Sequence, residues 1–125
     1  MANECTPLFR PGRAITGLTT GTVTGKTFVD VSATRDASTG LIKVATAGAG
    51  VKALGVAAYD AASGANVAIL RGGILPVTAG GTIAFGAEVE VGTAGKAITL
   101  ASGKAVGKAV EAGTNGNDVL IAFYE

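Results

Sequence analysis

Short runs of alternating apolar and polar residues, separated by glycine-containing turns about every 8–12 residues, limit what this chain can fold into. In residues 87–91, for example, Ala87, Val89 and Val91 alternate with two glutamates, Glu88 and Glu90. This period of two is typical of a strand with one buried face, so we expect both glutamates to point to solvent. Glycine supplies 20 of the 125 residues, well above the usual ~7%, and so provides many turns. The pattern predicts a small, mainly β protein, a single-domain β-barrel or β-sandwich.

The predicted strands cover most of the chain after residue 25. They span residues 26–33, 41–46, 55–60, 66–71, 74–79, 87–91, 96–100, 104–110 and 118–125. A short helix is the alternative for the alanine-rich residues 105–112, although Gly103 and Gly107 argue against a long one. The Arg71-Gly72-Gly73 interruption indicates a bulge or a tight hairpin turn.

The final predicted strand is apolar on both faces. Val119, Ile121 and Phe123 alternate with a second apolar set, Leu120, Ala122 and Tyr124. A strand of this kind is covered on both sides, either at the centre of a fold or where two subunits meet.

The first 20 residues differ from the rest. They contain Pro7 and Pro11, two arginines and the apolar pair Leu8-Phe9, and neither a helical nor a strand period fits them. Because proline fixes φ and favours extended geometry in the residue before it, we expect an extended N-terminal arm over residues 1–20. The compact β domain is then predicted to span residues 21–125.

The segment Gly21-Thr-Val-Thr-Gly-Lys-Thr27 resembles a nucleotide-binding loop but departs from it in three ways. Only three residues separate Gly21 from Gly25, and Thr20 stands where the glycine should be. A helix should follow, yet the next residues alternate as a strand does. We therefore interpret the segment as a turn that joins the arm to the first regular strand, which we expect to begin at Lys26.

Composition argues against catalysis and against metal, cofactor and nucleic-acid binding. The chain has no histidine, and its single cysteine, Cys5, has nothing of that kind to activate it, so we expect no enzyme and no metal or other cofactor. Paired glutamates could act on glycosides, but Glu88 and Glu90 read more simply as the solvated face of a strand. A net charge of +1 without a basic stripe favours no nucleic acid, and no apolar run is long enough to predict a membrane span.

Residues 50–125 resemble the small capsid decoration (cement) proteins of tailed bacteriophages. The resemblance rests on turn and strand-face positions: Gly55-Val56-Ala57, Asp60 to Gly64, Val67, Gly73, Pro76, Gly81, Ile83, Gly86, Val89, Gly95-Lys96, Gly107, Lys108-Ala109, Glu111-Ala112-Gly113 and Val119. Residues 1–45 match the family less well.

The resemblance implies a virion protein without enzymatic activity. It implies synthesis in the host bacterial cytoplasm and binding to the outer surface of the capsid. Its implied partners are the major capsid protein and further copies of itself, in a homotrimer that stabilises the lattice. We expect the arm to make the capsid contacts, through Pro7, Leu8, Phe9, Arg10 and Arg13. The second face of the last strand, Leu120, Ala122 and Tyr124, is then expected to form the subunit interface. The alternative is a β-sandwich binding module on the virion that recognises host-surface carbohydrate, although the chain has no tryptophan and only two tyrosines.

Overall fold

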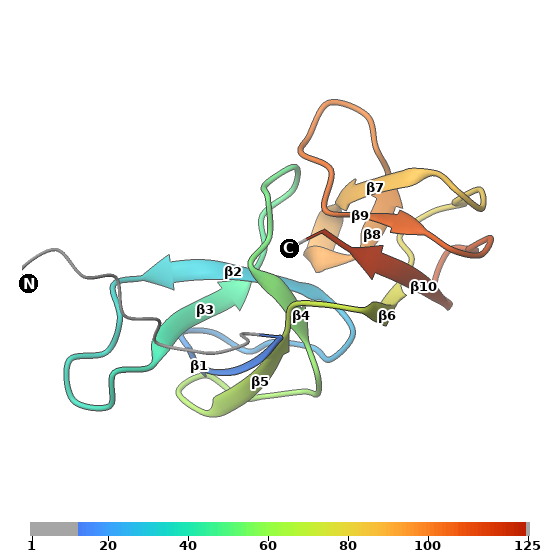
Figure 1. Ribbon diagram of the computed structural model, residues 1–125. Helices are drawn as coiled ribbons and strands as arrows, with labels where there is room; N and C mark the ends of the chain where they lie inside the picture. The colour runs from blue at the N-terminus through green and yellow to red at the C-terminus, as the bar shows by residue number, and fades with distance from the viewer. Residues whose placement is uncertain (1–12, 125) are drawn as a thin grey trace, which may run out of the picture.

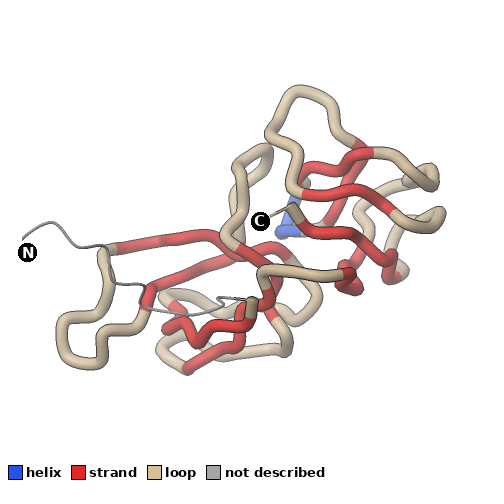
Figure 2. Tube along the Cα trace, viewed as in Figure 1, coloured by secondary structure: helices blue, strands red, loops and turns tan. Residues whose placement is uncertain are grey.

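The computed structural model describes residues 13–124, which form ten strands and one short 3₁₀ helix (Figures 1 and 2). The prediction of a small, mainly β domain with a barrel is confirmed. The strands are β1 (Ala14–Thr19), β2 (Phe28–Ala33), β3 (Ile42–Thr46), β4 (Gly55–Ala57), β5 (Asn66–Leu70), β6 (Ile74–Thr78), β7 (Glu88–Val91), β8 (Ala97–Thr99), β9 (Gly107–Ala109) and β10 (Asp118–Phe123), and the helix η1 spans Thr93–Gly95.

The strands form two groups of five, which Figure 1 shows as two lobes. The first group is a closed barrel in the order β1-β3-β2-β4-β5, in which β1 and β3 are parallel and the other pairs are antiparallel. The second group is a sheet in the order β6-β10-β9-β7-β8. Its two outer strands approach each other only through a parallel bridge between Ala79 and Ala97.

The two groups are repeats of one motif, which we call the first repeat (residues 13–72) and the second repeat (residues 73–124). Apart from the β1–β3 pair that closes the first barrel, strand pairing is the same in both, with β6 to β10 in the places of β1 to β5. Individual hydrogen bonds also recur: Lys26 N donates to Ala57 O at 2.9 Å, and Gly86 N donates to Ala109 O at 2.8 Å. The sequence carries the same relation, since Gly21-Thr22-Val23 corresponds to Gly81-Thr82-Ile83.

Each repeat has a core built from corresponding positions. The first core comprises Ile15, Val23, Val29, Val44, Ala57, Ala61, Val67 and Ile69. Seven of the eight corresponding positions belong to the second core: Leu75, Ile83, Val89, Ala97, Ala109, Val119 and Ile121. The eighth counterpart, that of Ala61, is the buried Gly113. The pattern of buried residues therefore follows from the repeated strand order.

The second core also takes in side chains from the first repeat, and these join the two repeats. Phe28 is fully buried there, and its ring centroid lies 6.3 Å from that of Phe123. Val56 of β4 belongs to the same cluster. Because these residues share a core across the repeats, the protein is one domain and not two independent ones.

Polar contacts at the open edge of the second sheet strengthen this junction. Thr78 N of β6 donates to Lys26 O at 2.9 Å, and Lys26 Nζ lies 2.7 Å from Asp118 Oδ2. Gly95 comes so close to the first repeat that a β-carbon there would lie 2.9 Å from Phe28 O. In a complete second barrel, β6 would pair with β8 along this edge. Here the first repeat occupies the edge instead.

The turn that contains the Gly-Thr-Val-Thr-Gly-Lys-Thr segment connects β1 to β2. Our expectation that the strand begins at Lys26 is wrong, because β2 begins at Phe28 and Lys26 has a left-handed backbone with φ 63°. Its counterpart is Gly86, with φ 79°. Gly25 is required for a different reason, since a β-carbon there would lie 2.8 Å from Tyr59 Cα.

Three other sequence-based expectations need correction. Residues 14–19, which we assigned to the arm, form β1 and pair with β3 and β5, so an arm can only precede them. The segment 105–112 contains β9 and no helix. The Arg71-Gly72-Gly73 interruption connects β5 to β6, which are not paired, and so links the two repeats instead of closing a hairpin.

The junction can be tested with Phe28→Ala. Removing a fully buried phenylalanine should lower the free energy of unfolding by about 3–5 kcal/mol, because the cavity lies in the shared core. Tyr59→Ala serves as the control: Tyr59 is 51% exposed, so its truncation should change that free energy by about 0.5 kcal/mol or less. Guanidinium denaturation measures both, and a loss under about 1 kcal/mol for Phe28→Ala would contradict the assigned junction.

The left-handed backbone at Lys26 predicts an order of stability among substitutions. Lys26→Gly and Lys26→Ala both lose the ion pair with Asp118, but only alanine keeps a β-carbon in the strained conformation. The glycine variant should therefore be the more stable by about 1 kcal/mol. Denaturant midpoints compare the two, and equal or reversed stabilities would show that the backbone at residue 26 is not strained.

Candidate interaction surfaces

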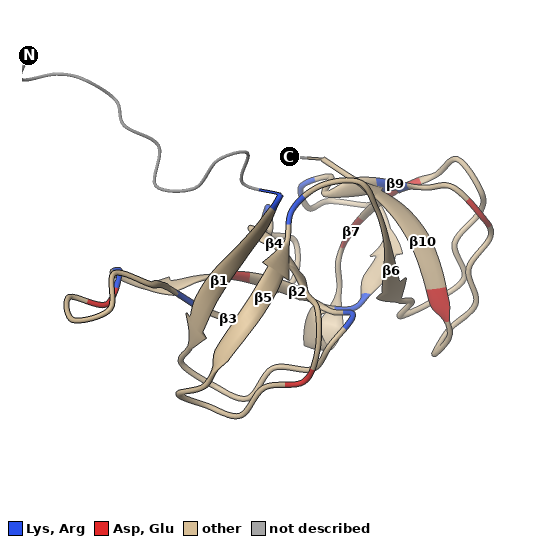
Figure 3. Cartoon of the chain, turned by 60° about the horizontal axis from the view of Figure 1, so that its bottom comes forward, with Lys and Arg blue, Asp and Glu red and all other residues tan. Residues whose placement is uncertain are grey.

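One outer surface of the second repeat is apolar and uncovered. We call it the second-repeat face and define it by Ile74, Pro76, Val110, Leu120 and Ala122. Leu120 lies opposite Pro76 and accepts a hydrogen bond at its carbonyl from Val110 N, while Ala122 lies opposite Ile74. Residues directly opposite on neighbouring strands share a face, so the five side chains are neighbours. In Figure 3, β6 carries no charge and β10 has one only at its start, Asp118.

The predicted subunit-interface residues lie together at this surface. Leu120 is 40% exposed and Ala122 is half-buried, both within the second-repeat face. Tyr124 lies at its border, where the hydroxyl donates to Glu88 Oε2 at 2.9 Å. This hydrogen bond to Glu88, with a smaller effect of burial, raises the pKa of Tyr124 above its usual value of 10.0. The strand β10 is central in its sheet, between β6 and β9.

Of the predicted capsid-contact residues, Pro7, Leu8, Phe9 and Arg10 lie outside the described residues. Arg13 is described and exposed, directly before β1. Its carbonyl accepts a hydrogen bond of 2.7 Å from Arg71 N. The chain therefore enters the fold beside the connection between the two repeats.

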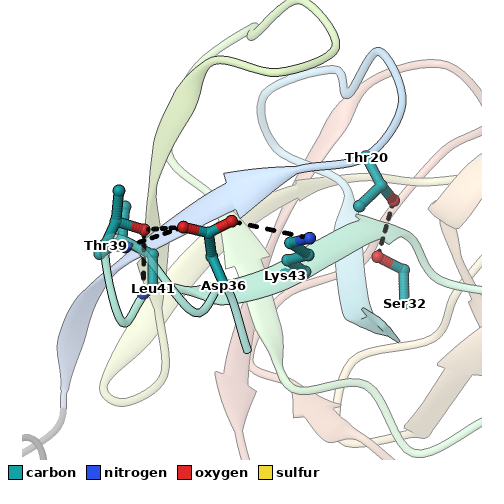
Figure 4. Close-up of polar contacts among 6 residues, drawn as sticks. All are labelled: Thr20, Ser32, Asp36, Thr39, Leu41 and Lys43. Carbon is teal, nitrogen blue, oxygen red and sulfur yellow. Dashed lines mark hydrogen bonds and ion pairs between the residues drawn. The ribbon is translucent and has the colours of Figure 1, made fainter. Parts of the chain in front are cut away.

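The β2–β3 hairpin extends from the first repeat and has no equivalent in the second, where η1 makes the connection (Figure 1). Figure 4 shows how its turn is held: Asp36 Oδ2 accepts hydrogen bonds of 2.8 Å from both Thr39 N and Thr39 Oγ1. Lys43 Nζ lies 3.7 Å from the other carboxylate oxygen. The backbone hydrogen bond from Thr39, followed by that from its side chain, lowers the pKa of Asp36 below 3.8.

The two glutamates of β7 do not share a solvated face, so that expectation is wrong for Glu90. Glu88 is exposed, but Glu90 is only 5% exposed. Glu90 Oε1 accepts a hydrogen bond of 3.3 Å from Ala101 N. Gly103 of the same repeat lies directly against Glu90 Oε2, and Gly50 of the first repeat packs on Gly103, with Gly50 N donating to Val91 O and Gly50 O accepting from Lys104 N. Loops of both repeats therefore bury the side chain. Period two alone could not reveal such a contact.

Residues 13–124 contain no pocket and no group of three or more His, Cys, Asp or Glu side chains placed to hold a metal ion. Within the same residues, no helix has the length and apolar character needed to cross a bilayer. What this part of the chain does present is surface.

Ile74, Pro76 and Val110 are surface residues that sequence reasoning missed. Ile74 is 58% exposed and Val110 46% exposed, although both lie in segments predicted as strands. Alternation alone assigns such residues to a core. The signal that could have found them is the internal repeat, because their counterparts in the first repeat are small or polar.

The sequence matches the model of a known protein family. The family model described as phage cement protein matches residues 9–123. The chain belongs to the phage cement protein family. This is a family of structural phage proteins and not of enzymes, and membership confirms the resemblance noted in the sequence.

A solved structure shares the fold. The N base of the head fiber gp8.5 of bacteriophage phi29 matches with a TM-score of 0.75 and 22% sequence identity, covering 89% of this chain and 92% of that one. At this identity the match supports the architecture of both repeats. No curated protein sequence matches the chain.

The Asp36 turn predicts a pH-dependent contribution to stability. A carboxylate whose pKa is lowered in the folded state stabilises the fold above its unfolded pKa, and this contribution disappears as the pH falls through the folded pKa. Asp36→Asn keeps an acceptor for Thr39 but removes the charge. The variant should therefore be less stable than the wild type at pH 7, and the difference should shrink below about pH 4. Thermal unfolding from pH 7 to pH 3 measures it; a difference that stays constant would contradict the assigned role of the charge.

Proposed function

We propose that this protein decorates phage heads: it binds the outer surface of the capsid, contacts the major capsid protein and stabilises its lattice. The observation that carries the proposal is the phage cement family match over residues 9–123. The fold it shares with the head-fiber base of phi29 agrees with a position on the virion head. Synthesis in the host bacterial cytoplasm fits a chain with a single cysteine, which can form no internal disulfide.

The proposed active form is a homotrimer whose interface includes Leu120, Ala122 and Tyr124. The second-repeat face supports this because it leaves Leu120 of the central strand β10 in solvent, together with its neighbours Ile74 and Val110. In a ring of three, each interface joins two different surfaces, so β10 of one subunit would be covered by its neighbour. Three weak capsid contacts on one trimer would also bind far more tightly than a single contact.

Capsid binding is proposed to involve the segment that precedes β1. Leu8 and Phe9 would fill an apolar groove beside Pro7, while Arg10 and Arg13 would pair with capsid carboxylates. The exposure of Arg13 next to β1 supports this arrangement, since its guanidinium is available to a partner at the point where the segment joins the barrel.

The test is decoration of purified phage heads that lack this protein. A variant without residues 2–12 keeps Arg13 and the whole of β1, so the barrel should fold normally. We expect it to lose at least about tenfold in affinity for heads, because each subunit loses its apolar anchors. Quantitative co-sedimentation with heads measures the affinity.

Two full-length variants test whether Leu8 and Phe9 themselves make the capsid contact, separately from whether the protein decorates heads at all. Leu8→Ser with Phe9→Ser should reproduce the loss, whereas Val31→Ala, an exposed valine of the β2–β3 hairpin, should not. Unchanged binding of both the shortened chain and the double variant would overturn the assignment of the arm. Failure of the wild-type protein to bind heads at all would overturn capsid decoration itself.

A further inference from the structure

The two repeats provide an internal comparison, because corresponding positions share strand geometry but differ in side chain. On the outer face, Ile74 of the second repeat replaces Ala14, Val110 replaces Ala58, and Leu120 replaces Ala68. Pro76 likewise replaces Thr16. Every one of these four positions is larger or less polar in the second repeat, so strand formation alone does not require their apolar character.

The fifth residue of the face, Ala122, differs from the other four because its counterpart in the first repeat is the larger side chain. Ala122 corresponds to Leu70, which packs against the core shared by the two repeats. At that end, the outer face of the first repeat is covered by the second repeat. The second-repeat face has no such cover from residues 13–124, although it carries the larger side chains.

We infer that the second-repeat face is the surface through which copies of this chain associate, whereas the corresponding face of the first repeat is not. The inference deepens the proposed trimer by assigning self-association to one repeat. Exposed apolar surface costs free energy in water and is recovered when a partner covers it, at about 25 cal/mol per Å². The fully buried core of an interface between identical subunits is more apolar than the rest of the protein surface, as this face is.

Charge at the border of the face fits a second copy as its occupant. Lys108 lies opposite Glu88, next to Ala122, and at the other end of β10 Asp118 pairs with Lys26, so the border carries charges of both signs. The face itself carries none. The chain's net charge is only +1, so a different surface of a second copy can cover the face, as a ring of three requires, without the one-sided repulsion that a strongly charged partner would meet.

Association by strand addition at the free edge of β6 is disfavoured. Pro76 has no backbone N–H to donate at that edge, and the N–H of Thr78 is already bonded to Lys26 O. The way in which the first repeat packs on the second also cannot simply continue. At the positions of Phe28 and Val56, the second repeat has Glu88 and Lys108. The outer face therefore remains as the apolar contact surface.

The experiment restores the residues of the first repeat in the second. Ile74→Ala, Val110→Ala and Leu120→Ala introduce the alanines that occupy positions 14, 58 and 68, at side chains that are 40–58% exposed and so contribute little to the folded monomer. Val31→Ala is the control, since Val31 is 55% exposed but lies outside the face. Sedimentation velocity of the full-length chain, over about nanomolar to 100 micromolar concentrations, measures association without any capsid.

We expect the wild type and Val31→Ala to form the same oligomer, and the triple variant to dissociate with a dissociation constant raised at least about a hundredfold. Unfolding midpoints at concentrations where all are monomeric should show that the triple variant still folds. An unchanged oligomer in the triple variant, or a wild-type monomer at every concentration, would overturn the inference. If the wild type is monomeric and the triple variant loses binding to heads, the occupant is the capsid and not a second copy.

The two proposals fail separately in this design. If the triple substitution dissociates the wild-type oligomer but the wild type does not bind heads, the assigned interface is supported and capsid decoration is overturned. If the wild type is a monomer that binds heads, capsid decoration is supported and the assigned interface is overturned.

Discussion

The burial of Phe28 between the repeats is the interaction on which the rest of the structure depends. The second sheet is not closed by its own strands, and its core is completed by residues of the first repeat, chiefly Phe28 and Val56. The first barrel, by contrast, closes through the parallel β1–β3 pair and has a core of its own. The second repeat therefore depends on the first for its stability, because the first repeat covers its open edge. Lys26 and Gly95 make close backbone contacts there.

This dependence explains why the two repeats have diverged at corresponding positions. Phe28 and Val56 face the neighbouring repeat, so they are apolar, while Glu88 and Lys108 occupy the same positions in the second repeat and are exposed. Charged residues at these positions are compatible with water, whereas Phe28 and Val56 are stable there only because the second repeat buries them. Lys26 and Gly86 show the same divergence at a left-handed turn position: lysine takes the strained backbone where its carbonyl and ammonium both bind the second repeat.

Sequence patterns predicted the β fold, most strands and the family, because period two and glycine-containing turns are local signals. They did not predict β1, since Gly17 and the threonines interrupt its alternation and only pairing with β3 and β5 makes it a strand. They placed Glu90 in solvent because the loops that cover it, at Gly103 of its own repeat and Gly50 of the other, meet only in the folded chain. They placed Leu120 and Ala122 on one face of the last strand, but the neighbours of that face on β6 and beside β9 follow from the sheet order, which alternation does not determine.

A duplicated motif gives a small capsid protein two surfaces with the same backbone and separate uses. One repeat keeps small side chains on its outer face, carries the longer β2–β3 hairpin and receives the N-terminal segment at Arg13. The other has a short connection at η1 and large apolar side chains outside. Since the strand geometry is shared, the larger and less polar side chains at positions 74, 76, 110 and 120 distinguish this face from the corresponding positions of the first repeat, and such a face gains free energy when covered.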